Sequence, residues 1–92
     1  MAVQCPSFPL GRVVITPNAL DHLSPADVQH GLQRHQAGDW GELDEQDRQE
    51  NETALRTGLR LLSAYRAASG VTFWIITEAS REVTTLLLPE DY

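Results

Sequence analysis

The chain has 92 residues, a formal net charge of −6 and 41% hydrophobic residues. This length allows one domain with a modest core, and the hydrophobic content excludes a wholly disordered chain. The negative charge disfavours broad binding of nucleic acid, which depends on neutralising phosphates. It suits a protein partner with a basic surface.

The location of the protein is predicted from its apolar segments. No apolar run approaches the ~20 residues of a membrane-spanning helix. The N-terminus lacks a basic region followed by an apolar stretch, so we expect no signal peptide. Cys5 is the only cysteine, which excludes an intrachain disulfide. We therefore expect a cytoplasmic protein with no membrane contact, no cofactor and no metal.

The first third of the chain predicts an arm, a strand and two helices. Residues 1–9, with two prolines, predict a flexible arm before a single domain over 10–92. The β-branched run 11–16 predicts a strand. Thr16-Pro17 and Ser24-Pro25 each place a capping residue before a proline, which predicts helices over 17–23 and 25–36. The inner faces of these helices are expected to carry Ala19, Leu20 and Leu23, then Val28, Leu32 and His35.

A third helix and three strands are predicted over the rest of the chain. The helix begins at Asp44 and ends near Thr57, because Gly58 is a typical C-terminal stop. Strands over 59–68, 71–77 and 82–88, joined by short turns, predict an antiparallel meander. The fold class is therefore α+β in the order β-α-α-α-β-β-β. We expect a small antiparallel sheet, with the first strand at its edge and the helices on one face.

The acidic centre of the chain is its clearest anomaly. Seven carboxylates fall within fourteen residues, opposed only by Arg48. They either complement a helix dipole and solvate an apolar-poor helix, or form a docking surface for a basic partner. Trp40, in a loop between two glycines, either packs under that loop or anchors an interface. The candidate partner-binding residues are Asp39, Trp40, Glu42, Asp44, Glu45, Asp47, Glu50 and Glu52.

Catalytic and metal-binding patterns are weak. The histidines lack ligand spacing, and the serines lack a nucleophile-elbow context. Tyr65-Arg66 with Glu78 and Arg81 has the residue types for acid–base work on RNA, although Glu78 and Arg81 equally suit a pair across a turn. Trp74 alternates with core candidates and so faces either solvent or a partner. The secondary site candidates are Arg66, Trp74, Glu78 and Arg81.

The chain resembles a family of small bacterial "plasmid-related" proteins found on plasmids, integrative elements and prophages. The resemblance is carried by Phe8-Pro9-Leu10-Gly11, Gly38-Asp39-Trp40-Gly41, Leu62-Ser63-Ala64-Tyr65, Trp74-Ile75-Ile76-Thr77-Glu78-Ala79, Thr84-Thr85 and Leu88-Pro89-Glu90-Asp91-Tyr92. The family turn Ala-Asp-Arg-Ser stands here as Ala79-Ser80-Arg81-Glu82. The order of elements is also similar to that of the RelE/ParE toxin superfamily, whose ribosome-directed members tend to be basic.

These observations predict a non-enzymatic, protein-binding module of a mobile element. Its expected partner is a basic host protein or nucleoprotein complex, so an anti-CRISPR or anti-restriction inhibitor is the concrete form of this hypothesis. The alternative is a RelE/ParE-like toxin, acting as an RNA endonuclease or gyrase inhibitor, or an inactive relative. A homodimer formed through an exposed sheet edge or the Trp74 face is a third interpretation.

Overall fold

Residues 8–92, described by a computed structural model, follow the predicted order of strands and helices. The elements are β1 (Arg12–Ile15), α1 (Pro17–His22), α2 (Pro25–Gln36), α3 (Glu45–Thr57), β2 (Leu61–Arg66), β3 (Thr72–Thr77), β4 (Val83–Leu87) and the short 3-10 helix η1 (Pro89–Asp91). The fold is α+β, as predicted. The predicted arm falls mainly on residues 1–7, which lie outside the described residues, whereas Phe8 is buried in the core.

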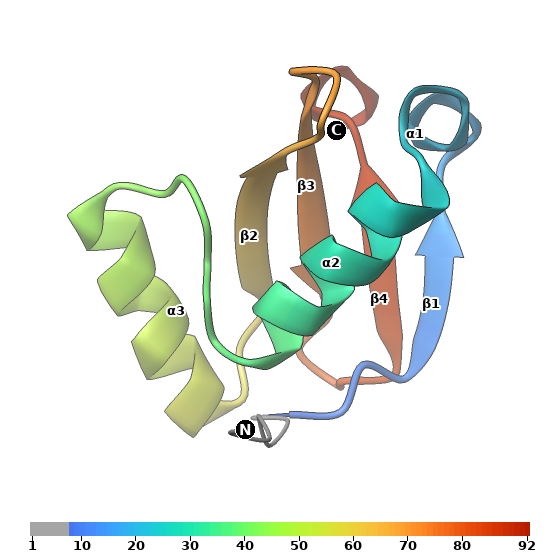
Figure 1. Ribbon diagram of the computed structural model, residues 1–92. Helices are drawn as coiled ribbons and strands as arrows, with labels where there is room; N and C mark the ends of the chain where they lie inside the picture. Colours follow the sequence, from blue (N-terminus) through green and yellow to red (C-terminus); the bar gives the residue numbers. More distant parts are fainter. Residues whose placement is uncertain (1–7) are drawn as a thin grey trace, which may run out of the picture.

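The sheet is mixed, so the prediction of a purely antiparallel sheet was wrong. Its strand order is β1-β4-β3-β2, with antiparallel pairs β2–β3 and β3–β4 and a parallel pair β1–β4. The reason is the path of the chain (Figure 1). The helices carry the chain from the end of β1 back to the opposite end of the sheet, where β2 begins. A meander of three strands that starts there ends with β4 running in the same direction as β1.

The helices do not all cover one face of the sheet, which corrects a second expectation. α1 and α2 lie across one face, whereas α3 stands beside the β2 edge (Figure 1). Both helices on the face begin with the predicted caps: the Thr16 hydroxyl accepts from Ala19 N at 3.2 Å, and Ser24 and Asp27 form a reciprocal capping box. These caps satisfy backbone donors that a helix leaves free at its start. No helix within residues 8–92 is long and apolar enough to cross a membrane.

The core has two clusters, on either side of α2. The larger one joins α1 and α2 to the inward face of β3 and β4, including the predicted core residues Phe73 and Ile75. The smaller one gathers Phe8, Trp40, Ala54 and Leu61. Leu20 was expected on the inner face of α1 but is 62% exposed. Because α1 stands at the end of β1, the edge strand, Leu20 has no further strand to cover it.

The outer edge of β2 is closed by the chain that precedes it. The Asn51 side chain accepts from Leu62 N at 3.1 Å and donates to Leu62 O, so it replaces a neighbouring strand at that position. Two residues further on, Ala64 N donates to Trp40 O and Ala64 O accepts from Glu42 N at 2.7 Å. Gly41 lies at this bridge with a φ of 77°, and a Cβ there would lie 2.0 Å from Ala64 O. The close approach therefore requires glycine.

Candidate interaction surface

α3 presents the acidic segment as a stable helix beside the sheet. Asp44 is its N-cap and accepts from Asp47 N at 2.8 Å, and Gly58 ends it in the left-handed conformation with a φ of 79°. Glu45 and Asp47 lie in the first turn, where carboxylates complement the helix dipole. Ala54 and Leu55 face the smaller core cluster, so the opposite side of the helix is left to solvent. The prediction of a helix from Asp44 to Thr57 is confirmed to within one residue.

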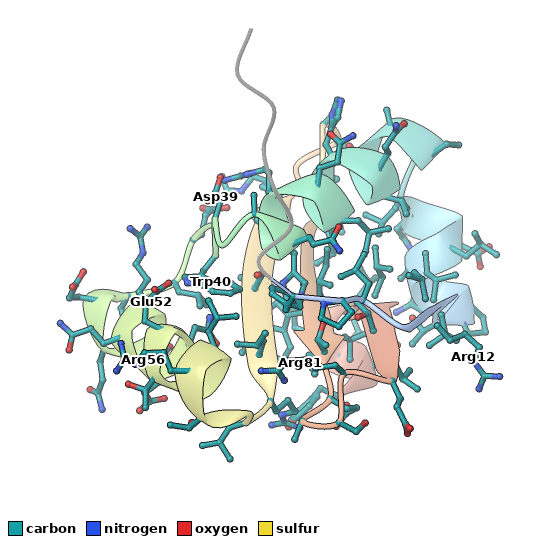
Figure 2. The ribbon with its side chains drawn as sticks, turned by 90° about the horizontal axis from the view of Figure 1, so that it is seen from below. Arg12, Asp39, Trp40, Glu52, Arg56 and Arg81 are labelled. Atoms are coloured by element: carbon teal, nitrogen blue, oxygen red, sulfur yellow. The ribbon has the colours of Figure 1, made fainter. Side chains whose placement is uncertain are left out.

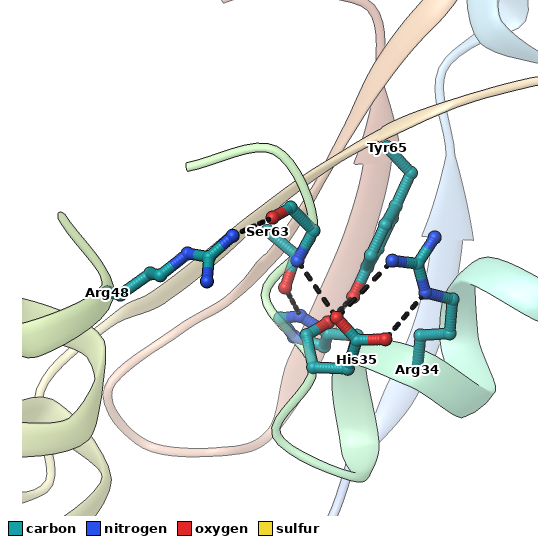
Figure 3. A network of polar contacts seen from close by, with 7 residues as sticks. Arg34, His35, Arg48, Ser63 and Tyr65 are labelled. Atoms are coloured by element: carbon teal, nitrogen blue, oxygen red, sulfur yellow. Dashed lines mark hydrogen bonds and ion pairs between the residues drawn. The ribbon is translucent and has the colours of Figure 1, made fainter. Parts of the chain in front are cut away.

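Asp39 is occupied by contacts that shape the loop after α2. Its carboxylate accepts from Arg34 Nε at 2.8 Å and from Gly41 N at 3.2 Å. Its carbonyl accepts from the Tyr65 hydroxyl. The Arg34 hydrogen bond is the main reason that the pKa of Asp39 lies below its ordinary value. Figure 3 shows Arg34 and Tyr65 converging on this loop, so Asp39 helps to hold the loop in place while its side chain stays half exposed.

Trp40 and Glu52 are also used inside the protein. The Trp40 side chain is only 5% exposed, and its ring stacks on Phe8 with centroids 6.3 Å apart. Its indole Nε1 donates to Glu52 Oε2 at 2.7 Å, which satisfies the one polar atom of the ring. Figure 2 shows the two side chains meeting between the loop and α3. Of the two interpretations left open for Trp40, packing under its loop is the one that the structure shows.

The remaining carboxylates lie on the outer surface of α3 and before it. Glu42 pairs with Arg66 at 3.4 Å, with both side chains more than half exposed, so this pair adds little stability. Glu45 accepts from Gln49 at 3.2 Å. Within residues 8–92, the ion pairs are Arg34–Asp39 and Arg66–Glu42, so none involves the acids of α3.

The one arginine inside the acidic segment does not offset these charges with an ion pair. Arg48 donates through Nε to Leu43 O at 3.1 Å and through a terminal nitrogen to Gly41 O at 3.0 Å. Its guanidinium is therefore bound to main-chain carbonyls of the loop before α3. Glu45, Asp47 and Glu50 are all exposed on the first turns of α3, and Asp47 and Glu50 border the same hollow. We call these three carboxylates the α3 acidic surface.

Two shallow hollows flank the α3 acidic surface. One, of about 570 Å³, lies beside Gln46, Gln49 and Thr53, and the other, of about 170 Å³, lies beside Leu43 and Asn51. Glu50 and Arg60 line both of them. Leu59, at the rim of the larger hollow, is 58% exposed. The α3 acidic surface thus lies beside two hollows and one exposed apolar side chain. Charge, surface hollows and an apolar contact are features of a protein-docking surface.

The secondary candidates do not form one site. Arg66 ends β2 and pairs in register with Thr72, whereas Arg81 lies in the turn at the other end of β3, after Thr77. The Arg81 guanidinium donates to the carbonyls of Leu59 and Ala54, and it also contacts the Glu78 carbonyl rather than its carboxylate. Arg81 adopts a φ of 64°, a left-handed conformation that is strained for a residue with a side chain and persists only where other contacts hold it. Arg81 therefore links the β3–β4 turn to the end of α3.

Trp74 lies on the face of the sheet opposite α2. Its ring meets that of Tyr92 edge-on, with centroids 5.7 Å apart, and Arg60 donates to the Tyr92 hydroxyl at 2.8 Å. Trp74 is half-buried by these contacts. Tyr92 therefore covers part of the Trp74 indole, which was expected to face either solvent or a partner.

A buried polar network, which sequence reasoning missed, lies between the two core clusters. The His35 ring is fully buried, with Nδ1 against the Ser63 hydroxyl and Nε2 2.9 Å from Thr77 Oγ1. Thr77 in turn contacts Thr84 Oγ1 at 2.8 Å, and Thr84 donates to Leu10 O at 2.7 Å. The only available signal was three hydroxyl residues at inward-facing strand positions.

The direction of this network makes Nε2 of His35 a hydrogen-bond donor. Thr84 gives its proton to Leu10 O, so Thr77 must donate to Thr84 and His35 Nε2 must donate to Thr77. In the neutral ring, Nδ1 carries no proton and accepts from the Ser63 hydroxyl. Burial, with a smaller contribution from the Arg81 charge, lowers the pKa of His35 to about 4. Although Ser63 and His35 are a hydroxyl and a base in contact (Figure 3), neither is exposed to a substrate.

A polar cleft that the sequence did not predict lies beside α2. It encloses about 450 Å³ and is lined by His30, Arg34, Tyr65 and Arg66, together with Asp27. The Arg34 guanidinium lies 4.6 Å from the centre of the Tyr65 ring, and Asp27 accepts from Ala68 N. Because Arg34 and Arg66 are each paired with a carboxylate, the cleft has no uncompensated guanidinium. Within residues 8–92, no three His, Cys, Asp or Glu side chains gather to hold a metal ion.

A comparison of the chain with known protein families, curated proteins and solved structures found no match.

Proposed function

We propose that this protein is a non-enzymatic binding module that docks a basic partner protein through the α3 acidic surface. The carrying observation is that Glu45, Asp47 and Glu50 form no ion pair within residues 8–92, while Arg48 beside them is bound to main-chain carbonyls. A surface with an excess of negative charge steers association with a surface of the opposite sign. Arg60 and Leu59 beside the α3 acidic surface supply a hydrogen-bond donor and an apolar contact.

The partner class that best fits this surface is a basic nucleic-acid-binding protein. Such proteins neutralise phosphates with Arg and Lys side chains, and carboxylates held on a helix compete for those same side chains. Together with the resemblance to proteins of plasmids and prophages, this chemistry supports an anti-defence role, in which the protein blocks a host CRISPR or restriction complex.

The alternative of a RelE/ParE-like toxin has less support from the geometry. The arginines suited to phosphate stabilisation lie at opposite ends of β3, one in an ion pair and the other among backbone carbonyls. Tyr65 is buried, and its hydroxyl donates to Asp39 O. Burial raises the pKa of Tyr65 well above its ordinary value, which makes it a poor general base near neutral pH. We therefore favour binding over RNA cleavage.

The test compares two triple charge reversals. The first variant carries Glu45→Lys, Asp47→Lys and Glu50→Lys, and it keeps Asp44 because that residue caps α3. The matched control carries Asp21→Lys, Glu82→Lys and Glu90→Lys, three exposed acids away from α3, so both variants have the same net charge. Tagged wild type and variants are used to capture proteins from bacterial lysates that contain CRISPR and restriction complexes.

We expect wild type and control to retain the same basic complex at low salt and to release it at high salt. At about 0.5–1 kcal/mol for each exposed charge contact, the α3 variant should bind roughly tenfold to a hundredfold more weakly. Circular dichroism and urea unfolding verify that both variants are folded. Equal capture by the folded α3 variant would remove the proposal.

A further inference from the structure

The outer edge of β1 has backbone groups that no other strand satisfies. β1 is the end strand of the sheet. Arg12 N donates to Glu82 O, just before β4, at 2.8 Å, and Thr16 N donates to Leu86 O of β4 at 3.0 Å. In a parallel pair, alternate residues bond to the neighbour. Val13 and Ile15 therefore direct their N–H and C=O groups away from the sheet. In Figure 1 no described segment lies beside this edge.

The two edges of the sheet are treated differently. At β2, the Asn51 side chain and the segment around Gly41 occupy the outward backbone groups. At β1, none of the four residues is proline, and the one charged residue, Arg12, stands at the start of the strand. An open edge of β-branched residues is a template for another strand.

An apolar groove adjoins the open edge on the side of the helices. It encloses about 580 Å³ and is lined almost entirely by apolar side chains from β1, α1 and α2. Val13 is 41% exposed and Leu20 is 62% exposed, and both line this groove. A strand added at β1 would bring its own side chains over the groove and cover these two residues.

The charges at the two ends of β1 indicate which strand would pair with its open edge. Arg12, at the start of β1, forms no ion pair within residues 8–92 and points away from the helices (Figure 2). At the other end, the Thr16 hydroxyl donates to Asp91 Oδ2 at 2.7 Å, and Asn18 and Leu88 N also donate to that carboxylate. These bonds keep Asp91 ionised, with the Thr16 bond lowering its pKa most. A cation at one end and an anion at the other are self-complementary in an antiparallel pair.

We propose that β1 pairs antiparallel with β1 of a second copy, about a two-fold axis at Val14, to form one sheet through both copies. Val13 then lies opposite Ile15 of the second copy, and the two residues exchange both backbone hydrogen bonds. Arg12 lies opposite Thr16 of the second copy, within reach of its Asp91. The two-fold axis repeats each contact, as an isologous interface requires. Because α3 stands at the far edge of each sheet, the dimer displays two α3 acidic surfaces.

The first experiment is a cross-linking test in the full chain with Cys5→Ser, which removes the only other thiol. Val14→Cys places two thiols directly opposite each other at the two-fold axis, in the non-hydrogen-bonded pair where Cα atoms lie ~4.5 Å apart. Thr85→Cys is the matched control, because Thr85 pairs with Val14 on β4 and lies on the same face of the sheet. In the dimer the two Thr85 positions are separated by three strand spacings, roughly 14 Å, which is too far for a disulfide.

We expect oxidation to convert the Val14→Cys protein to a covalent dimer while the Thr85→Cys protein stays largely uncross-linked. We also expect wild type to sediment as a dimer. Arg12→Glu should weaken self-association about tenfold. Arg56→Glu, the same change on an exposed arginine of α3, should leave self-association unchanged. Monomeric wild type with equally slow cross-linking of both cysteine variants would overturn the proposal and leave the edge to an extended strand of another protein. Equal effects of the two arginine reversals would also overturn the proposed pairing.

Discussion

The buried His35 should make the protein sensitive to mild acid. Its pKa falls from 6.5 to about 4 in the folded protein, so the unfolded chain binds a proton that the folded one does not between these pH values. The stability supplied by the neutral ring is complete above pH 6.5 and is lost as the pH falls towards 4. A difference of about 2.5 pH units at 1.36 kcal/mol each gives a loss of about 3 kcal/mol. That is a large share of the stability expected for a small domain.

The measurement is the free energy of unfolding in urea at intervals between pH 7.5 and 4. Over most of this window Asp27, Asp39 and Asp91 contribute little, because their pKa values lie below 3.8. His35→Gln, which cannot be protonated, should lower stability at pH 7.5 and flatten the dependence on pH. His30→Gln, at an exposed position of the same helix, should keep the wild-type slope. Parallel pH profiles for wild type and His35→Gln would refute this reasoning.

Two further predictions concern the closed edge of β2. Asn51→Ala removes both side-chain hydrogen bonds to Leu62 and should cost about 2 kcal/mol in urea unfolding, whereas an unchanged midpoint would mean that water replaces the amide without loss. Gly41→Ala and Gly58→Ala both place a Cβ at a positive φ, but only at Gly41 does it collide with Ala64 O. Thermal unfolding should show a loss of about 1 kcal/mol for Gly58→Ala and a much larger loss for Gly41→Ala, and equal losses would contradict the close approach.

Local signals in the sequence were sufficient for the elements but not for their arrangement. Thr16-Pro17, Ser24-Pro25 and Gly58 marked helix ends because capping depends on residues a few positions apart. The parallel pairing of β1 with β4 depends on where the chain re-enters the sheet some forty-five residues later, which no local pattern encodes. Phe8 was assigned to an arm because prolines surround it, although its ring packs against His35 and Trp40.

The sequence locates the acidic segment but does not show which of its carboxylates are free of intramolecular contacts. Which carboxylate is free depends on cations and donors that are distant in sequence or unremarkable in it. Asp39 is taken by Arg34 and Glu52 by the Trp40 indole, and the sequence alone assigns neither pair. His35 was expected on an inner stripe, but its partners Ser63 and Thr77 lie 28 and 42 residues away. Such networks become visible only when the strands are in register.

The way α3 is attached to β2 determines how the helix would meet a partner. The chain leaves the sheet beside Ala64, returns to it at Leu61, and is held between these points by Asn51 against Leu62. α3 is thus fastened along one strand rather than suspended on two free loops. A preorganised helix loses little conformational entropy when it is bound. A bound protein that displaced α3 would therefore also displace β2, to which the helix is attached.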